Sequence, residues 1–237
     1  MRVAGQVTRA MLDAVRAHVK PGVTTLDLEN VAEAKLAEYG AKAAFKGYHG
    51  FPCVLCTSVN SQVVHGIPSA KQVLKEGDIV SVDCGAIVDG YFGDAAITVA
   101  VGQKIDPQTV RLLQVTEASL QAAIDVVRPG ATLGDVGAAV QGVVEAAGFS
   151  VVRDFVGHGI GSHLHEDPQV PNYGLAGRGM KLRAGMVIAI EPMVNAGKAD
   201  VQVLGDGWTA VTVDGSMSAH FEHSVAVTAT GARILTE

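Results

Sequence analysis

The chain repeats itself at a constant offset of 108 residues. The segment VKPGVT at 19–24 matches VRPGAT at 127–132, and LKEGDIVSVD at 74–83 matches LRAGMVIAIE at 182–191. Because one offset holds across two separated blocks, a chance match is a poor explanation. The repeat predicts two related halves, approximately 1–105 and 106–237, which pack about a pseudo-twofold axis within a single domain spanning 1–237.

Hydrophobic periodicity predicts that each half begins with helices and continues in strands. Apolar residues recur at every fourth position from Val3 through Val7, Met11 and Val15 to Val19, and predict a helix that stops before Pro21. Further helices are expected over about 26–39, 107–127 and 133–147, and strands over 53–59 and 78–101. Helices followed by antiparallel strands in each half indicate the α+β class.

Composition argues against several classes of protein. With 48% hydrophobic residues the chain can bury a substantial core, and its net charge of −6 argues against nucleic acid or an anionic membrane as the main partner. The start, MRVAGQVTRAML, lacks the apolar run of a signal peptide, and the longest purely apolar stretch, 186–190, is too short to span a bilayer. Cys53 and Cys56 would point to opposite faces of a strand, so a shared metal or redox pair is not expected. We therefore expect a cytoplasmic protein.

A predicted β-hairpin places two carboxylates on one face. Asp89-Gly90 is a strong signal for a two-residue turn, which would pair Val88 with Tyr91. In that register Asp83 and Asp94 are diagonal neighbours on the same face, within about 8 Å at the backbone. Two such carboxylates repel each other unless a positive charge lies between them, and a metal ion is the natural candidate.

Two further carboxylates lie at positions where burying an unpaired charge would cost free energy. Glu191 ends the apolar run VIAI and is the repeat partner of Asp83, so the pseudo-twofold axis would bring these two strand ends together. Glu222 lies in an alternating strand whose neighbours are apolar. Both positions suggest a buried charge that needs a partner.

Histidines could supply nitrogen ligands to the same site. His158 lies between Gly157 and Gly159, which would let its backbone approach a metal closely. His165 could reach the same cavity, whereas His163 is expected to face solvent. His65 precedes Gly-Ile-Pro and could end a strand at a cavity edge. The remaining candidates are expected on the surface or behind a metal ligand: His18, His220 and His223.

Five of these residues form a coherent ligand set: Asp83, Asp94, His158, Glu191 and Glu222. One divalent ion would leave four carboxylates strongly negative, whereas two ions would offset them. Oxygen-rich ligands with one imidazole suit cobalt, manganese, iron(II) or zinc. Two bridged ions that activate a water molecule are the basis of two-metal hydrolysis.

At these residues the sequence resembles the type I methionine aminopeptidases, a family of pita-bread metallopeptidases. The motifs run over nearly the whole chain: YHGFP at 48–52, NSQVVHGIP at 60–68, GHGIGSHLHEDP at 157–168, IEPMV at 190–194, DGWTAVT at 206–212 and SAHFEHS at 218–224. The resemblance implies the pita-bread fold and a bacterial-type enzyme that removes the N-terminal methionine where the second residue is small. It also implies nascent polypeptide N-termini as partners, met transiently at the ribosome. No coiled coil or exposed apolar helix is evident in the sequence, so we expect a monomer.

The resemblance implies a role for each candidate by position. The five ligands would hold two divalent ions, with Asp94 and Glu222 bridging, and Glu191 would also take a proton from the attacking water. His65 would contact the scissile nitrogen or the leaving amine, and His165 the carbonyl oxygen. The methionine pocket would be lined, in addition to these two histidines, by Phe45, Tyr48, Phe51, Cys56, Phe155, Leu164 and Trp208. Asn60 and Ser218 match a monovalent-cation site of relatives.

The sequence departs from the family pattern at a few positions and leaves two alternatives open. Phe45 and Val64 stand where some bacterial relatives have cysteine, and Ser162-His163 replaces a frequent Arg-Gly, so the fine shape of the pocket is open. One alternative is a proline-specific aminopeptidase P or prolidase, although these usually carry a large N-terminal domain. The other is a binding module that keeps the fold without activity, although such proteins typically lose ligands and all five are present here.

Overall fold

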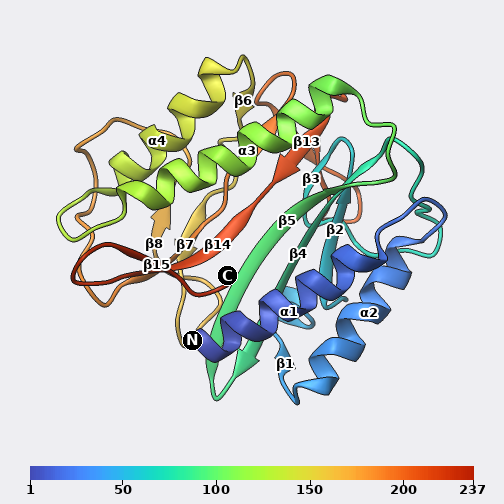
Figure 1. The fold of residues 1–237 in the computed structure, drawn as a ribbon, viewed down its shortest axis with the longest axis horizontal. Helices are drawn as coiled ribbons and strands as arrows, with labels where there is room; N and C mark the ends of the chain where they lie inside the picture. Colours follow the sequence, from blue (N-terminus) through green and yellow to red (C-terminus); the bar gives the residue numbers. More distant parts are fainter.

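Helices cover one face of a curved antiparallel sheet in the computed structural model, which describes residues 1–237. The four helices are α1 (Arg2–His18), α2 (Thr25–Glu38), α3 (Pro107–Val126) and α4 (Leu133–Ala146). Figure 1 shows α1 and α2 together over one end of the sheet and α3 and α4 together over the other. No helix combines the length and the hydropathy that a membrane crossing requires.

The main sheet has nine strands and joins the two halves of the chain. Its order is β1-β4-β5-β14-β9-β7-β8, with β2 also paired to β4 and β15 to β14. Two three-stranded sheets, β13-β10-β6 and β11-β12-β3, lie beside it. The strands are β1 (Lys42–Ala43), β2 (Leu55–Val59), β3 (Gln62–Val64), β4 (Ile79–Val88), β5 (Tyr91–Ala100), β6 (Ser150–Val151), β7 (Gly157–Gly159), β8 (Glu166–Val170), β9 (Val187–Ile190), β10 (Met193–Asn195), β11 (Val201–Val203), β12 (Ala210–Thr212), β13 (Ser218–His220), β14 (Glu222–Val227) and β15 (Ala232–Ile234). A short 3₁₀ turn covers Tyr48–Gly50.

Residues that are equivalent in the repeat make equivalent contacts. Thr24 and Asp27 form a capping box at the start of α2, and Thr132 and Asp135 form the same box at the start of α4. The Gly22 N–H donates to the Leu74 carbonyl at 2.8 Å, and the equivalent Gly130 N–H donates to Leu182 at 2.9 Å. The α+β fold with two related halves is therefore confirmed.

The main hydrophobic core lies between the helices and the sheet and draws on both halves of the chain. The predicted first helix is confirmed, and α1 buries Val7, Met11 and Val15, whereas Val3 at the start of the apolar series is 55% exposed. The physical reason is that a spacing of four drifts around a helix of 3.6 residues per turn. Over four turns the ends of such a series leave the buried stripe.

Candidate metal centre and substrate pocket

Three carboxylates point from neighbouring strands toward the same side of the main sheet. The hairpin register is confirmed: Val88 pairs with Tyr91, and Asp83 pairs with Ala96. Ala96 in turn pairs with Glu222 of β14, so Asp83 and Glu222 flank the same residue of β5. Asp94 is two residues from Ala96 and shares its face. Register alone therefore gathers Asp83, Asp94 and Glu222.

Glu191 and His158 complete the cluster from β9 and β7. The pairing of His223 with Ile190 places Glu191, the next residue after β9, beside Glu222. The His158 Nε2 atom lies 3.5 Å from Glu191 Oε1 and 3.8 Å from Asp94 Oδ2. Asp94, His158 and Glu222 each offer a ligand atom, and these atoms all lie within 4.8 Å of one another. All five predicted ligands line one cavity of about 220 Å³.

Burial opposes ionisation of all four carboxyl groups, and repulsion from neighbouring carboxylates adds to it for three of them. Burial raises the pKa of Asp94 to about 7. Burial, followed by repulsion from neighbouring carboxylates, raises the pKa of Asp83, Glu191 and Glu222 well above the ordinary range. Burial also lowers the pKa of His158 to about 4, so the ring is a neutral base with a free lone pair.

Unpartnered oxygen atoms show that the cluster fits a divalent cation. Asp83 Oδ1, Asp94 Oδ1 and Glu222 Oε1 are buried without a hydrogen-bond partner. Buried polar atoms are normally satisfied, and an unpaired buried carboxylate is costly. A cation bound among these oxygens and the His158 nitrogen would satisfy them, and carboxylates with one imidazole suit a first-row divalent metal.

The glycines beside His158 have a different cause from the one predicted. A Cβ atom at Gly157 would lie 2.3 Å from the Ala189 carbonyl oxygen, and one at Gly159 would lie 2.3 Å from the Asp167 carbonyl oxygen. The close approach is therefore to neighbouring backbone, not to a metal. Glycine lets β7 fit tightly between its neighbours and thereby positions the His158 ring.

The other residues that line the cavity are mostly apolar or aromatic. They include the predicted pocket residues Phe45, Tyr48, Phe51, Cys56, His65, Leu164, His165 and Trp208. The Phe51 and Trp208 rings pack edge to face, with centroids 5.1 Å apart. Phe155 is not among the lining residues. Its ring packs at 90° against His65, with centroids 5.5 Å apart, so it supports that histidine.

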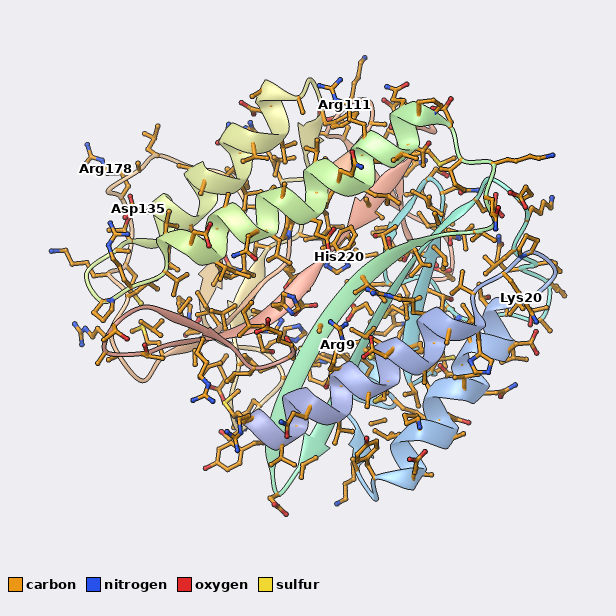
Figure 2. The ribbon with its side chains drawn as sticks, in the orientation of Figure 1. Arg9, Lys20, Arg111, Asp135, Arg178 and His220 are labelled. Atoms are coloured by element: carbon orange, nitrogen blue, oxygen red, sulfur yellow. The ribbon has the colours of Figure 1, made fainter.

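The remaining histidines divide into exposed and buried groups. His18 and His163 are exposed, in agreement with the sequence prediction. His220 is only 2% exposed and lies near the centre of the molecule (Figure 2), so a surface position is wrong for it. Its Nε2 atom is 3.9 Å from Glu191 Oε2. This position behind a candidate ligand is the second of the two positions that the sequence predicted for His220. His223 is half-buried and its Nδ1 atom pairs with the Thr236 hydroxyl at 2.9 Å.

Three supporting residues were missed by the sequence interpretation. Glu29 is 4% exposed, and its carboxylate accepts the N–H groups of Val54 and Leu55 at 2.6 and 2.8 Å, where β2 begins. Its place on the buried stripe of α2 beside Leu28 and Ala32 was a signal that could have revealed it. Asn172 donates to the Glu191 carbonyl at 3.0 Å, and no sequence pattern singled it out. His49 lines the pocket, and its place in the YHGFP motif was a signal that could have revealed it.

Known proteins resemble the chain over its full length. The model of Metallopeptidase family M24 matches residues 1–229. The chain is 52% identical to Methionine aminopeptidase A of Synechocystis sp., covering 100% of this chain and 93% of the relative. It is 50% identical to Methionine aminopeptidase 1 of Bacillus subtilis, covering 100% of this chain and 94% of that relative.

Solved structures extend the comparison to the fold. The crystal structure of methionine aminopeptidase from Thermotoga maritima superposes with a TM-score of 0.98 at 51% identity, covering 100% of this chain and 95% of that one. A prolidase from Pyrococcus horikoshii has a TM-score of 0.79 at 20% identity, with 60% of its chain covered, and shares the fold alone. These neighbours confirm the predicted pita-bread fold. The chain belongs to metallopeptidase family M24.

Proposed function

We propose that this chain removes the N-terminal methionine from nascent proteins and peptides, with a preference for a small second residue. The observation that carries the proposal is one cavity of about 220 Å³ that is lined by five candidate metal ligands together with aromatic and apolar side chains. Relatives that are 52% and 50% identical over the full chain bear the name methionine aminopeptidase. The unbranched methionine side chain suits a narrow apolar slot. The carboxylate cluster in the same cavity suits metal-dependent hydrolysis of the peptide bond that follows the methionine.

Asp83, Asp94, His158, Glu191 and Glu222 would hold the divalent metal ions. Bound ions of this kind lower the pKa of a water molecule and polarise a carbonyl group. We expect two ions because four carboxylates need more than one divalent charge to offset them. Cobalt, manganese, iron(II) and zinc all suit the donor set.

Protein groups around this centre would carry out the remaining steps. Glu191 would accept the proton of the attacking water at its carboxylate. His165 would donate a hydrogen bond to the carbonyl oxygen as negative charge develops there. His65 would contact the scissile nitrogen or the leaving amine, and burial lowers its pKa to about 4, which keeps it neutral. Phe45, Tyr48, Phe51, Cys56, Leu164 and Trp208 would hold the methionine side chain, with Phe155 supporting His65.

The monovalent-cation site would lie where Asn60 and Ser218 meet. The Ser218 N–H donates to the Asn60 carbonyl at 2.8 Å, which supports a common site. The Asn60 side chain already accepts from the Ile79 N–H at 3.0 Å and donates to Asp78 at 2.8 Å. Backbone carbonyl groups would therefore supply the ligands of the monovalent cation. Measuring whether the melting temperature depends on potassium or sodium tests for such a site.

The cellular setting follows from the same proposal. We propose a monomeric cytoplasmic enzyme, a single catalytic domain over 1–237, that meets nascent N-termini at the ribosome. Sedimentation of the purified protein, with and without ribosomes carrying nascent chains, tests the oligomeric state and the association.

A peptide assay tests the proposed function. Metal-free protein is titrated with each of the four metals, and release of methionine from Met-Ala-Ser is compared with cleavage of Leu-Ala-Ser and of an Xaa-Pro peptide. We expect metal-dependent release of methionine and little cleavage of the other two. Glu222→Gln should abolish turnover, whereas the exposed Glu145→Gln should not. Equal cleavage of Met, Leu and Phe peptides would indicate a general aminopeptidase, and preferential Xaa-Pro cleavage would indicate a prolidase.

A further inference from the structure

A single hydrogen bond holds the imidazole ring of His165. Its Nδ1 atom lies 2.7 Å from the Tyr48 hydroxyl, although the two residues are 117 positions apart in the chain. The ring otherwise packs against the His158 ring, with centroids 4.3 Å apart, and against the Tyr48 ring at 5.2 Å. His165 is exposed, so burial does not fix its orientation. The Tyr48 hydroxyl is therefore the main constraint on this ring.

Tyr48 is itself held in a defined turn. Its N–H donates to the Phe45 carbonyl at 2.9 Å, and its carbonyl accepts from the Phe51 N–H at 2.9 Å. The turn requires left-handed backbone at Gly47, with φ 89°, and at His49, with φ 47°. Such conformations cost energy in a residue other than glycine and persist where the surrounding structure specifies them. The turn thus presents the tyrosine hydroxyl at a fixed place.

The cavity wall does not need this hydroxyl. Phe51, in the same turn, lines the cavity with a plain phenyl ring and packs against Trp208. An apolar slot for a methionine side chain would be served equally well by phenylalanine at position 48. A hydroxyl within hydrogen-bond distance of His165, another residue of the cavity lining, points to a separate task.

The direction of the hydrogen bond determines what His165 can do. A neutral imidazole carries its proton on one nitrogen and accepts a hydrogen bond at the other. If Tyr48 donates to Nδ1, the proton lies on Nε2, and Nε2–H can donate to a substrate carbonyl. If Nδ1–H donates to Tyr48 instead, Nε2 presents a lone pair and would repel that oxygen.

We propose that Tyr48 is a positioning residue whose hydroxyl donates to His165 Nδ1 and so holds His165 as the Nε2–H donor toward the substrate carbonyl. This inference rests on the proposed function, in which His165 stabilises the developing charge on that oxygen. Partners that orient a metal-bound histidine are typically worth about 10- to 100-fold in activity, and we expect an effect of the same order for a partner that orients His165.

A double-mutant cycle on the metal-loaded enzyme tests the proposal. Tyr48→Phe keeps the ring and removes the hydroxyl, and we expect it to lower kcat for Met-Ala-Ser by about 10- to 100-fold with KM and metal content nearly unchanged. In a His165→Ala background the same substitution should have no further effect, because its target is gone. Tyr91→Phe, at an exposed tyrosine of the β4–β5 hairpin, is the matched control and should leave kcat unchanged.

The outcomes separate this inference from the proposed function. An equal loss of kcat from Tyr48→Phe in the parent and in the His165→Ala background would show that Tyr48 does not act through His165. Unchanged kcat in the single variant would overturn the proposal as well. If the parent releases no methionine, the proposed function fails. Long-range ¹H–¹⁵N NMR of the zinc-loaded parent then still tests the hydrogen bond, since we expect the Nε2–H tautomer at His165, and the Nδ1–H tautomer would refute it.

Discussion

The metal-free protein should become more stable when Asp94 is replaced by asparagine, although the same change should abolish activity. Asp94 is 4% exposed, and burial raises the pKa of its carboxyl from 3.8 to about 7. A shift of that size corresponds to about 4 kcal/mol in the free energy of unfolding. Asparagine keeps the size of the side chain and carries no charge to desolvate.

The sign of the effect follows from proton binding. Between about pH 4 and pH 7 the folded protein retains a proton on Asp94 that the unfolded chain has released. The stability of the parent therefore falls as the pH rises through this window, and the loss is complete above it. Burial lowers the pKa of His65 and His158 to about 4, and this contributes in the opposite direction. Those histidines are present in both proteins, so the part of their effect that does not depend on Asp94 cancels in the difference between variant and parent.

Urea unfolding of chelator-treated protein measures this difference. We expect Asp94→Asn and the parent to be about equally stable near pH 4, and the variant to be more stable by up to about 4 kcal/mol near pH 8. Asp89→Asn, at the exposed turn of the same hairpin, is the matched control and should show no such trend. Saturating divalent metal should reverse the order, because it stabilises only a protein that binds it. A metal-free variant that is less stable than the parent near pH 8, or a difference that does not change with pH, would refute the reasoning.

Four further substitutions test other parts of the site. His65→Ala and His165→Ala should each lower kcat by about 10²- to 10³-fold while metal content, measured by elemental analysis, stays near that of the parent; loss of metal would assign these residues to its coordination instead. Phe45→Cys should change the ratio of cleavage between methionine and norleucine peptides without changing metal content, since one apolar contact in a pocket is worth about 1–3 kcal/mol. An unchanged ratio would show that Phe45 does not contribute to the selectivity of the pocket. Glu29→Ala should lower the free energy of unfolding by about 2–5 kcal/mol, because the Val54 and Leu55 N–H groups lose their acceptor; a change within about 0.5 kcal/mol, the range of ordinary surface substitutions, would contradict this account.

Local patterns in the sequence were sufficient for the four helices and for the hairpin. The Asp89-Gly90 turn determines the pairing of the two strands around it, and the observed register of Asp83 with Ala96 is the predicted one. The helices at 107–126 and 133–146 begin at the predicted residues and end within one residue of the predicted ends. These features depend on neighbours close along the chain, and the 108-residue repeat adds the relation between the halves.

Tertiary structure alone decided which polar residues lie together and what supports them. The hydrogen bond between Tyr48 and His165, the burial of His220 behind Glu191 and the place of Phe155 beside His65 each join segments that are distant in sequence. The glycines beside His158 were noticed in the sequence, but only the packing of β7 against neighbouring backbone explains them. Sequence periodicity reports which face of an element is apolar; it carries no information on how a curved sheet brings the faces of separate elements into contact. The residue types of the candidate site were therefore sufficient to predict its chemistry, whereas the orientation of each group depends on long-range packing.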